Sequence, residues 1–305
     1  MWNTASAAVV RRSRSTEQAR VAATKARAAP DGKRLTVAKQ RFAPVRPIAA
    51  SPWTGRDKLA RPLRRLVRDV RRVQDQLKEQ LGPDELERSF RALELRARDQ
   101  GLSEVLPQAL AHATLAAERL YGKSWIICGE EQAWELRPRD NQLACAAALA
   151  LGQVAELDTG EGKTLCVALA AACHALTGRV HAVTANDYLA RRDGEWMSPL
   201  LESLGVSTAT VVHQTPHGER QAAYQARVTY VSVKELGADF LRDTLTSERS
   251  ALFLPELETA ILDEIDFILV DEARIPLILA EQIHASENLC HQFNEAVAEL
   301  VDRQE

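Results

Sequence analysis

The sequence predicts an α/β fold, in which a doubly wound parallel sheet follows an α-helical amino-terminal region. Before about residue 142, apolar residues recur at spacings of three and four, as they do along one face of a helix. After it, short apolar runs alternate with helical segments, and strands that alternate with helices form a parallel sheet covered on both faces. The 46% content of hydrophobic residues is normal for a globular core, and 27% charged residues argue against general disorder.

Residues 1–58 are predicted to be a basic and largely disordered arm, because they are rich in Ala, Arg and Pro and show little periodicity. Residues 1–72 contain 19 Lys and Arg against 4 Asp and Glu, whereas residues 73–305 contain 20 against 38. A basic segment on an acidic body suggests an anionic partner, either lipid or nucleic acid. A solvated tail without a partner explains this charge equally well.

The five cysteines form no CxxC pair and are odd in number, which fits a reducing compartment without a disulfide framework. No Cys/His spacing resembles a zinc site, so most of these cysteines are expected to be small buried hydrophobic residues. No apolar run approaches the roughly 20 residues that a membrane-spanning helix needs.

Residues 59–136 are predicted to form the helical region. A first helix is expected up to about Leu81, where a Gly-Pro pair breaks the apolar pattern, and a later one over 105–120. The stretch KSWIICGEEQAWEL, residues 123–136, is predicted to be an insertion containing a short strand or a loop.

Residues 137–280 are predicted to form the sheet domain. Helices are expected over 163–176 and 187–204, between the apolar runs. The strands are expected over 153–157, 180–184, 206–212, 228–232 and 259–264. Residues 281–305 begin a further amphipathic segment without an obvious end.

The stretch DTGEGKTL, residues 158–165, is the strongest local signal for chemistry. A Gly-rich turn between a strand and a helix forms an anion cradle, and Gly160 and Gly162 let the backbone approach phosphate without a Cβ clash. Lys163 can reach the β- and γ-phosphates, and the Thr164 hydroxyl can bind Mg²⁺. This short TGxGKT form is typical of helicase-like motors. A structural turn of chance composition is the alternative.

The acidic pair Asp263-Glu264 follows the apolar run AIL, which predicts a position at the carboxyl-terminal edge of the sheet. There Asp263 would hold Mg²⁺ through water and Glu264 would polarise the attacking water. A pair of surface charges is the alternative. A second pair, Asp271-Glu272, stands eight residues later.

Gln142 precedes the helix that leads into the strand of the phosphate loop. A glutamine amide can both donate to and accept from the edge of adenine. The position of Gln142 in the sequence is weak evidence for that role, and by itself it favours an ordinary surface glutamine.

The order of four motifs resembles one family, SecA, the ATPase motor of bacterial protein export. The motifs are the phosphate loop, VTANDYLARRD (183–193), VTYVSVKELGADFLRD (228–243) and LDEIDFILVDEARIPLI (262–278). The resemblance covers roughly residues 60–283. It implies a RecA-like domain of the P-loop NTPase type, with ATP and Mg²⁺ as cofactors and a protein-secreting ATPase activity.

The resemblance also implies roles for individual residues of this chain. Gln142 becomes the adenine-reading glutamine, and Lys163, Asp263 and Glu264 become the catalytic residues. Mg²⁺ is bound through Thr164 and Asp263. The residues that hold ATP are then Gln142, Thr159, Gly160, Glu161, Gly162, Lys163 and Thr164. A relay of nucleotide state within the domain is implied for Asn186, Asp187 and Tyr188. For Asp271-Glu272 the implied role is structural, as part of an exit segment that pairs with Arg274 or another basic residue.

The partners implied are a SecYEG-type channel, preproteins, and anionic membrane lipids bound by the basic arm. No nucleic acid is expected, because the arm shows no aromatic residues interleaved for base stacking. The implied location is cytoplasmic, and peripheral on the inner (plasma) membrane. Residues 281–305 would begin a preprotein-crosslinking segment, and the second motor half would have to come from a longer chain or a second chain. Hydrolysis by this chain alone is expected to be slow, since an arginine finger contributes roughly 10³- to 10⁵-fold.

Several departures from the family pattern favour a divergent or accessory member. Arg139 stands where the family has an aromatic residue, and Asp158 stands where it has Arg. Leu157 replaces the first Gly of the full GxxxxGK[ST] pattern, and the insertion has no family counterpart. Two other functions stay open: a nucleic-acid-stimulated helicase-like ATPase, and a non-enzymatic nucleotide-binding interaction module.

Overall fold

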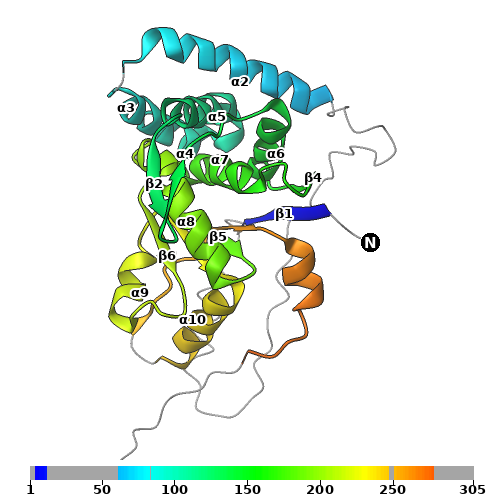
Figure 1. Ribbon diagram of the computed structural model, residues 1–305, viewed down its shortest axis with the longest axis vertical. Helices are drawn as coiled ribbons and strands as arrows, with labels where there is room; N and C mark the ends of the chain where they lie inside the picture. The colour runs from blue at the N-terminus through cyan, green and yellow to red at the C-terminus, as the bar shows by residue number, and fades with distance from the viewer. Residues whose placement is uncertain (1–3, 12–60, 83, 247–250, 278–305) are drawn as a thin grey trace, which may run out of the picture. The chain divides into compact units, whose positions relative to one another are not determined.

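The computed structural model describes residues 4–11, 61–82, 84–246 and 251–277 (Figure 1). The chain divides into two compact units, residues 1–275 and 276–305, and the helices and strands of the described residues belong to the first. Among the described residues, no helix combines the length and the apolar composition that crossing a membrane requires.

Four helices form the predicted helical region. Helix α2 begins close to its expected position and presents Val67, Val70 and Leu77 to α5, while the other face of the helix carries exposed arginines. Helix α5 is the centre of this region, since most of its residues are buried. The helices are α2 (Arg61–Gln80), α3 (Leu86–Arg91), α4 (Leu93–Gln100) and α5 (Leu102–Arg119).

The insertion is a two-stranded hairpin of β2 (Ser124–Ile127) and β3 (Glu130–Ala133). Its two turn residues, Cys128 and Gly129, both have positive φ, which is the geometry of the tight turns that match strand twist. The buried Trp134 anchors the hairpin, because its indole nitrogen donates to the carbonyl of Ala117 in α5 at 2.9 Å. The sequence predicted a strand or loop here, and the structure has two strands.

The sheet has six strands in the order β4-β1-β8-β5-β7-β6. Strands β8, β5, β7 and β6 pair in parallel, which confirms the predicted doubly wound parallel sheet. Its strands other than β1 are β4 (Val154–Asp158), β5 (Val180–Thr184), β6 (Thr208–Val211), β7 (Val228–Ser232) and β8 (Thr259–Leu262). Its helices are α6 (Asp140–Ala150), α7 (Lys163–Ala175), α8 (Asp187–Glu202), α9 (His217–Ala223) and α10 (Val233–Leu245), followed by the π-helix η3 (Phe267–Asp271).

Both faces of the sheet are covered. Successive residues of a strand point to opposite faces, and accordingly Ala182 belongs to the core shared with α5, α6 and α7, while Val183 belongs to a second cluster. The second cluster contains Tyr224 at the end of α9 and is packed against Leu236 of α10. One hydrophobic core therefore joins the helical region to the sheet, which fixes α6 and α7 beside the predicted phosphate loop.

The prediction of a disordered arm is corrected for residues 4–11, which form the strand β1 (Thr4–Arg11). This strand pairs antiparallel with β4 on one side and with β8 on the other. Pairing between residues about 150 and 250 positions apart leaves no local periodicity, so composition alone suggested a tail. Residues 12–60 of the predicted arm and the segment 281–305 lie outside the described residues.

Candidate nucleotide site

The predicted phosphate loop lies between the end of β4 and the start of α7. Strand β4 ends at Asp158 and α7 begins at Lys163. Gly160 and Gly162 have φ angles of 84° and 80°, in the left-handed region that glycine adopts without a Cβ penalty. The first N–H groups of α7 have no partner within the helix, so the loop and the helix start can together receive an anion.

Gln142 of α6 lies directly against this loop. A Cβ added at Gly162 would stand 2.4 Å from the Gln142 side-chain nitrogen, so only glycine fits there without a shift. That nitrogen, Nε2, donates to the carbonyl of Glu161 at 2.8 Å, and Oε1 accepts from the backbone N–H of Arg139 at 2.8 Å. Both ends of the amide are thus used within the protein, and adenine reading by Gln142 stays a prediction.

The Glu161 side chain is held by two residues to which sequence reasoning gave no such role. Its Oε2 accepts from Arg139 Nη2 at 3.0 Å and from Asn141 Nδ2 at 2.8 Å. Arg139 stood out in the sequence only as a departure from a family pattern. The only signal in the sequence was that both residues lie within three positions of Gln142. The start of α6 therefore braces the phosphate loop.

Lys163 points back toward the end of β4. Its Nζ lies 3.4 Å from the carbonyl oxygen of Leu157 and 3.5 Å from that of Asp158. These are long hydrogen bonds, and they leave the ammonium group weakly held. A phosphate in the loop would offer stronger, charge-assisted acceptors.

Asp263 and Glu264 lie where β8 ends, as predicted. The N–H of Asp263 still donates to the carbonyl of Val183 in β5 at 2.9 Å, and the chain then turns sharply, because Glu264 has a φ of 53°. The Asp263 carboxylate accepts from the N–H of Glu264 at 3.0 Å. A left-handed conformation is uncommon for a residue other than glycine, and such residues gather at functional sites.

Burial, and after it the nearby charge of Asp193, raise the pKa of Asp263 to about 6, while Lys163 opposes the shift. Strands β4 and β8 run in the same direction, since both pair antiparallel with β1, so the phosphate loop and the acidic pair both follow strands that end at the same edge of the sheet. A partly buried carboxylate of this kind favours a cation. The described residues contain no cluster of three or more His, Cys, Asp or Glu that could hold a metal by themselves. Mg²⁺ is commonly held by one or two protein oxygens together with substrate phosphates, and the Asp263 carboxylate and the Thr164 hydroxyl are oxygen donors of that kind.

Asp193 of α8 is a buried carboxylate that sequence reasoning missed, although it ends the motif VTANDYLARRD. It is 4% exposed and forms an ion pair with Arg192 at 2.7 Å. Burial raises the pKa of Asp193 as well, and the charge of Glu264 contributes. The site therefore contains three mutually repelling carboxylates near one edge of the sheet.

The motif residues Asn186 and Asp187 start α8 at the same edge. The Asn186 side chain caps the helix by accepting from the N–H of Leu189 at 2.9 Å. Asp187 accepts from the hydroxyl of Ser232, at the end of β7, and from the N–H of His213 at 2.7 Å. Tyr188 is exposed. Asp187 thus connects the start of α8 to the segments that follow β6 and β7. The relay of nucleotide state stays a prediction.

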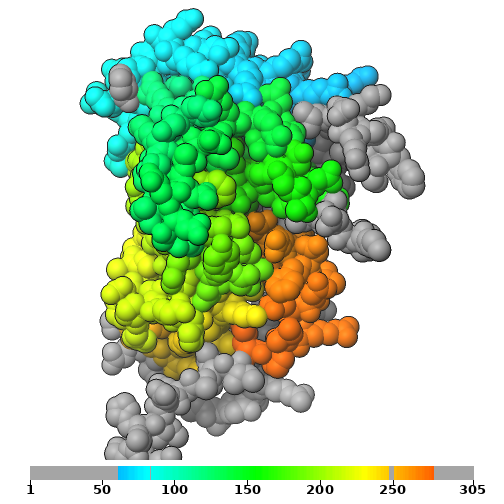
Figure 2. Space-filling view, in the orientation of Figure 1, coloured from blue at the N-terminus to red at the C-terminus, as the bar shows by residue number. Residues whose placement is uncertain are grey.

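The second acidic pair lies at the end of η3, where it contacts the start of α10. Asp271 ends η3, and Glu272 forms an ion pair with Lys234 of α10 at 3.0 Å. The expected pairing with a base is confirmed for Glu272. Figure 2 shows the η3 segment in orange on the surface, where Leu269 and Val270 are exposed.

Comparison with known proteins agrees with this arrangement. The model of the SecA DEAD-like domain family matches residues 51–305. The protein translocase subunit SecA of Carboxydothermus hydrogenoformans is 40% identical over 250 residues, which are 80% of this chain and 27% of that protein. SecA of Mycobacterium avium is 48% identical over 62% of this chain and 23% of its own length, and SecA 2 of Mycobacterium leprae is 45% identical over 67% and 24%. The chain spans about a quarter of the length of these relatives. Since the family model matches most of the sequence, the chain belongs to the SecA DEAD-like domain family.

Proposed function

We propose that this chain is the ATP-binding motor domain of a SecA-type protein translocase, and that it binds ATP with Mg²⁺ where β4 and β8 end. The observation that supports this most is the turn between β4 and α7, in which Gly160 and Gly162 have φ angles of 84° and 80° and the Gln142 amide lies against the loop. The ion pair of Arg139 with Glu161 supports it further, because it ties the loop to the start of α6.

Each residue then has a separate task. The N–H groups of Gly160, Gly162, Lys163 and Thr164 would receive the phosphate oxygens, and the Lys163 ammonium would leave the β4 carbonyls for the β- and γ-phosphates. The Thr164 hydroxyl and the Asp263 carboxylate would hold Mg²⁺, and the ion would supply positive charge against the phosphates. Glu264 orients the attacking water from its turn at the end of β8.

Titration calorimetry of the chain with ATP and Mg²⁺ tests this proposal. Replacing Lys163→Ala removes a charge-assisted contact to phosphate, and we expect about 10- to 100-fold weaker binding. Lys123→Ala removes an equal charge from the exposed start of the hairpin and serves as the control. Absence of ATP binding to the unchanged chain, or equal affinity of the two variants, would contradict the proposal.

Coupling of hydrolysis to export through a membrane channel is proposed for the larger assembly, since the chain spans about a quarter of its relatives. Alone, it is expected to hydrolyse ATP slowly, because an arginine finger supplied by another domain is worth roughly 10³- to 10⁵-fold. The helicase-like alternative makes a different prediction: single-stranded RNA, and not an unfolded preprotein, would then stimulate hydrolysis once the second motor half is added. The non-enzymatic alternative predicts no stimulation by either.

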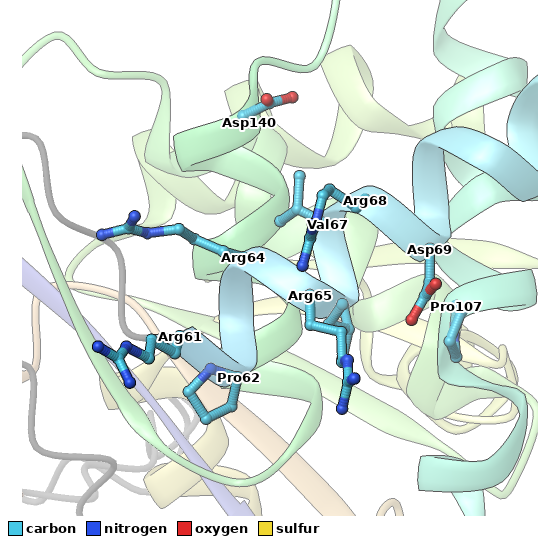
Figure 3. Close-up of a pocket in the computed structure, with 10 residues that line it drawn as sticks. Arg61, Pro62, Arg64, Arg65, Val67, Arg68, Asp69, Pro107 and Asp140 are labelled. Atoms are coloured by element: carbon cyan, nitrogen blue, oxygen red, sulfur yellow. The ribbon is translucent and has the colours of Figure 1, made fainter.

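A basic surface on α2 supports peripheral binding to anionic lipid. Figure 3 shows arginines projecting from this helix in different directions, with the ring of Pro107 at one side. They line a cavity of about 990 Å³, together with the acidic residues Asp69 and Asp140. The arginines are Arg61, Arg64, Arg65 and Arg68. Each arginine near an anionic bilayer contributes about 1 kcal/mol. A cytoplasmic location, with peripheral attachment to the inner membrane, follows if this surface meets such a bilayer.

Vesicle co-sedimentation tests the lipid proposal. Reversal of two charges by Arg65→Glu and Arg68→Glu is expected to weaken binding to phosphatidylglycerol vesicles at least about thirtyfold. The matched control, Arg88→Glu with Arg96→Glu, changes two exposed arginines outside the α2 surface. Equal losses in both double variants would mean that only total charge matters, and would contradict a role for this surface.

A further inference from the structure

Two buried cysteines lie against each other beside the proposed nucleotide site. Cys145 of α6 is 6% exposed and Cys166 of α7 is 0% exposed. Their thiol groups are hydrogen-bonded to each other. The sequence predicted small buried residues here, and it could not predict the contact, because the two cysteines come from different helices. A pair of thiols in contact has a chemistry that a single buried cysteine lacks.

Helices α6 and α7 run side by side in the same direction, which places the two cysteines at the same level (Figure 1). Near the helix starts, Gln142 lies against Gly162. Near the ends, Nε2 of His174 lies 3.3 Å from the carbonyl oxygen of Leu149. Each cysteine stands one helical turn after the first of these contacts. The residues around both cysteines are mainly alanine, and such small side chains allow two helix axes to approach closely.

The Cys166 thiol connects this pair to the phosphate loop. Its Sγ donates to the carbonyl of Gly162, the residue before α7, at 3.5 Å. The hydrogen bond with Cys145 and burial raise the pKa of Cys166 well above its ordinary value, so the pair rests as neutral thiols. Cys173, two turns later in α7, is equally buried, and burial alone raises its pKa. The chain therefore contains its own matched comparison for the pair.

We propose that Cys145 and Cys166 are a reversible disulfide site, and that its oxidant is a small peroxide. Cys145 reacts first, because it has exposed surface: its sulfur attacks a peroxide oxygen, an S–O bond forms, and the O–O bond breaks with loss of water. The Cys166 sulfur then attacks the Cys145 sulfenic acid, so that an S–S bond forms and a second water leaves. Two thiols thus lose two electrons and two protons, and hydrogen peroxide becomes two water molecules.

Closure of this bond acts on the phosphate loop. Oxidised Cys166 has no proton for the Gly162 carbonyl, so that contact is lost. A disulfide brings the sulfurs to about 2.05 Å and draws the first turns of α6 and α7 together. Gln142 already occupies the space beside Gly162, where an added Cβ would lie 2.4 Å from its nitrogen. The loop therefore has to shift, and the oxidised chain should bind ATP less tightly.

The coupling to nucleotide affinity rests on the proposed function, whereas the disulfide site does not. The cysteine content of the chain fits a reducing compartment. In such a compartment the pair stays reduced until peroxide appears, and a disulfide of this kind is transient and senses redox state.

Peroxide oxidation followed by peptide mapping tests the site. In a Cys128→Ser, Cys290→Ser background, three of the five cysteines remain. We expect hydrogen peroxide to lower the free thiols from three to one, with a cross-linked Cys145–Cys166 peptide in the mass spectrum, and dithiothreitol to reverse both changes. This measurement uses a chain that keeps both cysteines, so it does not depend on the folding of a variant that lacks one.

Two further variants identify the partners. Cys173→Ala removes the other buried cysteine of α7 and should leave the cross-link unchanged. Cys166→Ala should stop the reaction at a sulfenic acid on Cys145, which dimedone captures.

Titration calorimetry with ATP and Mg²⁺ tests the coupling. The oxidised chain is expected to bind ATP at least about tenfold more weakly than the reduced chain, and reduction should restore the affinity. Cys145→Ala, treated with the same peroxide, should keep its affinity within about twofold, which separates the effect of the disulfide from that of other oxidation.

These measurements separate the two levels of the proposal. Absence of the cross-linked peptide, or equal yields of peptides in which Cys173 is the partner, would overturn the disulfide site. Unchanged ATP affinity of the oxidised chain would overturn the coupling. If the reduced chain binds no ATP but the cross-link forms, the proposed function fails and the disulfide site stands.

Discussion

At the scale of single residues, Asp263 is the clearest case of a side chain whose environment suits a bound cation. Burial and the charge of Asp193 raise its pKa from 3.8 to about 6. The folded chain therefore binds this proton more tightly than the unfolded chain does. The resulting stabilisation is fully present below pH 3.8 and is lost as the pH rises through about 6.

Asp263→Asn should consequently stabilise the Mg²⁺-free chain at pH 7.5. A shift of about two pKa units corresponds to at most about 3 kcal/mol, and we expect this gain to shrink toward zero as the pH falls to 4. Urea unfolding at both pH values measures it. The exposed Asp84→Asn provides a matched control, and an equal gain in that variant would contradict the explanation.

The two glycines of the phosphate loop offer a second comparison. Both have φ near 80°, so Ala at either position costs about 1–2 kcal/mol of backbone strain. Only Ala at position 162 would also collide with Gln142, since a Cβ at Gly160 meets nothing within 4 Å. Gly162→Ala should therefore lower the free energy of unfolding more than Gly160→Ala. The difference should disappear when Gln142→Ser is added to both, and its persistence would contradict the collision.

At the scale of elements, a buried ion network joins α9 to α10. The Arg220 guanidinium lies 2.8 Å from oxygens of both Glu235 and Asp239, and Asp239 also accepts from the Tyr224 hydroxyl at 2.8 Å. Arg220 further donates to the carbonyl of Val212, after β6, at 3.0 Å. One cation thus holds two helices against the end of a strand.

Arg220→Met should lower the free energy of unfolding by about 3 kcal/mol, because two buried carboxylates lose the cation they share, which leaves Asp239 to Arg242 and Glu235 to the exposed His213. Chemical denaturation measures the loss. Adding Asp239→Asn and Glu235→Gln should recover part of it, since the uncompensated charges are then gone. Arg96→Met, at an exposed position, is the control and should change stability by less than about 0.5 kcal/mol. A loss of similar size in the control would contradict the network.

The elements also show what the sequence could predict. Strands β5 and β7 were predicted at the residues they occupy, because each is a short apolar run that is buried throughout and flanked by helices. Strand β1 was missed, since its stability comes from partners about 150 and 250 residues away. The sequence did not decide between a strand and a loop for residues 123–136, because β3 is exposed along its whole length and has no apolar pattern.

At the scale of the whole molecule, the division at Ile275 and Pro276 makes a direct prediction. The described site residues and the hydrophobic core lie within residues 1–275. A chain that ends at Ile275 should therefore keep its ATP affinity within about twofold and its midpoint of thermal unfolding within about 3 °C, because each unit has its own contacts. Calorimetry of both chains checks this, and a loss of ATP affinity would show that residues 276–305 contribute to the site.

The site itself was only partly predictable. The motifs identified Lys163 and Asp263, because a phosphate loop and an acidic strand end are local patterns in the sequence. The bracing of Glu161 by Asn141 and the buried charge of Asp193 depend on how α6 and α8 pack, which no spacing records. Gln142 lies between these cases, since its position was predicted but its contacts with the loop were not.

The pairing of β1 has a consequence for the order in which the sheet can open. Residues 4–8 pair with β4 and residues 8–11 pair with β8, so Ala8 is the point where the two ladders overlap. Peeling from Thr4 would release β4 while the other ladder stayed closed. A half-detached intermediate then exists, in which the phosphate loop is loosened and Asp263 is still held in place. Amide protons of residues 154–158 should accordingly exchange with solvent before those of residues 259–262.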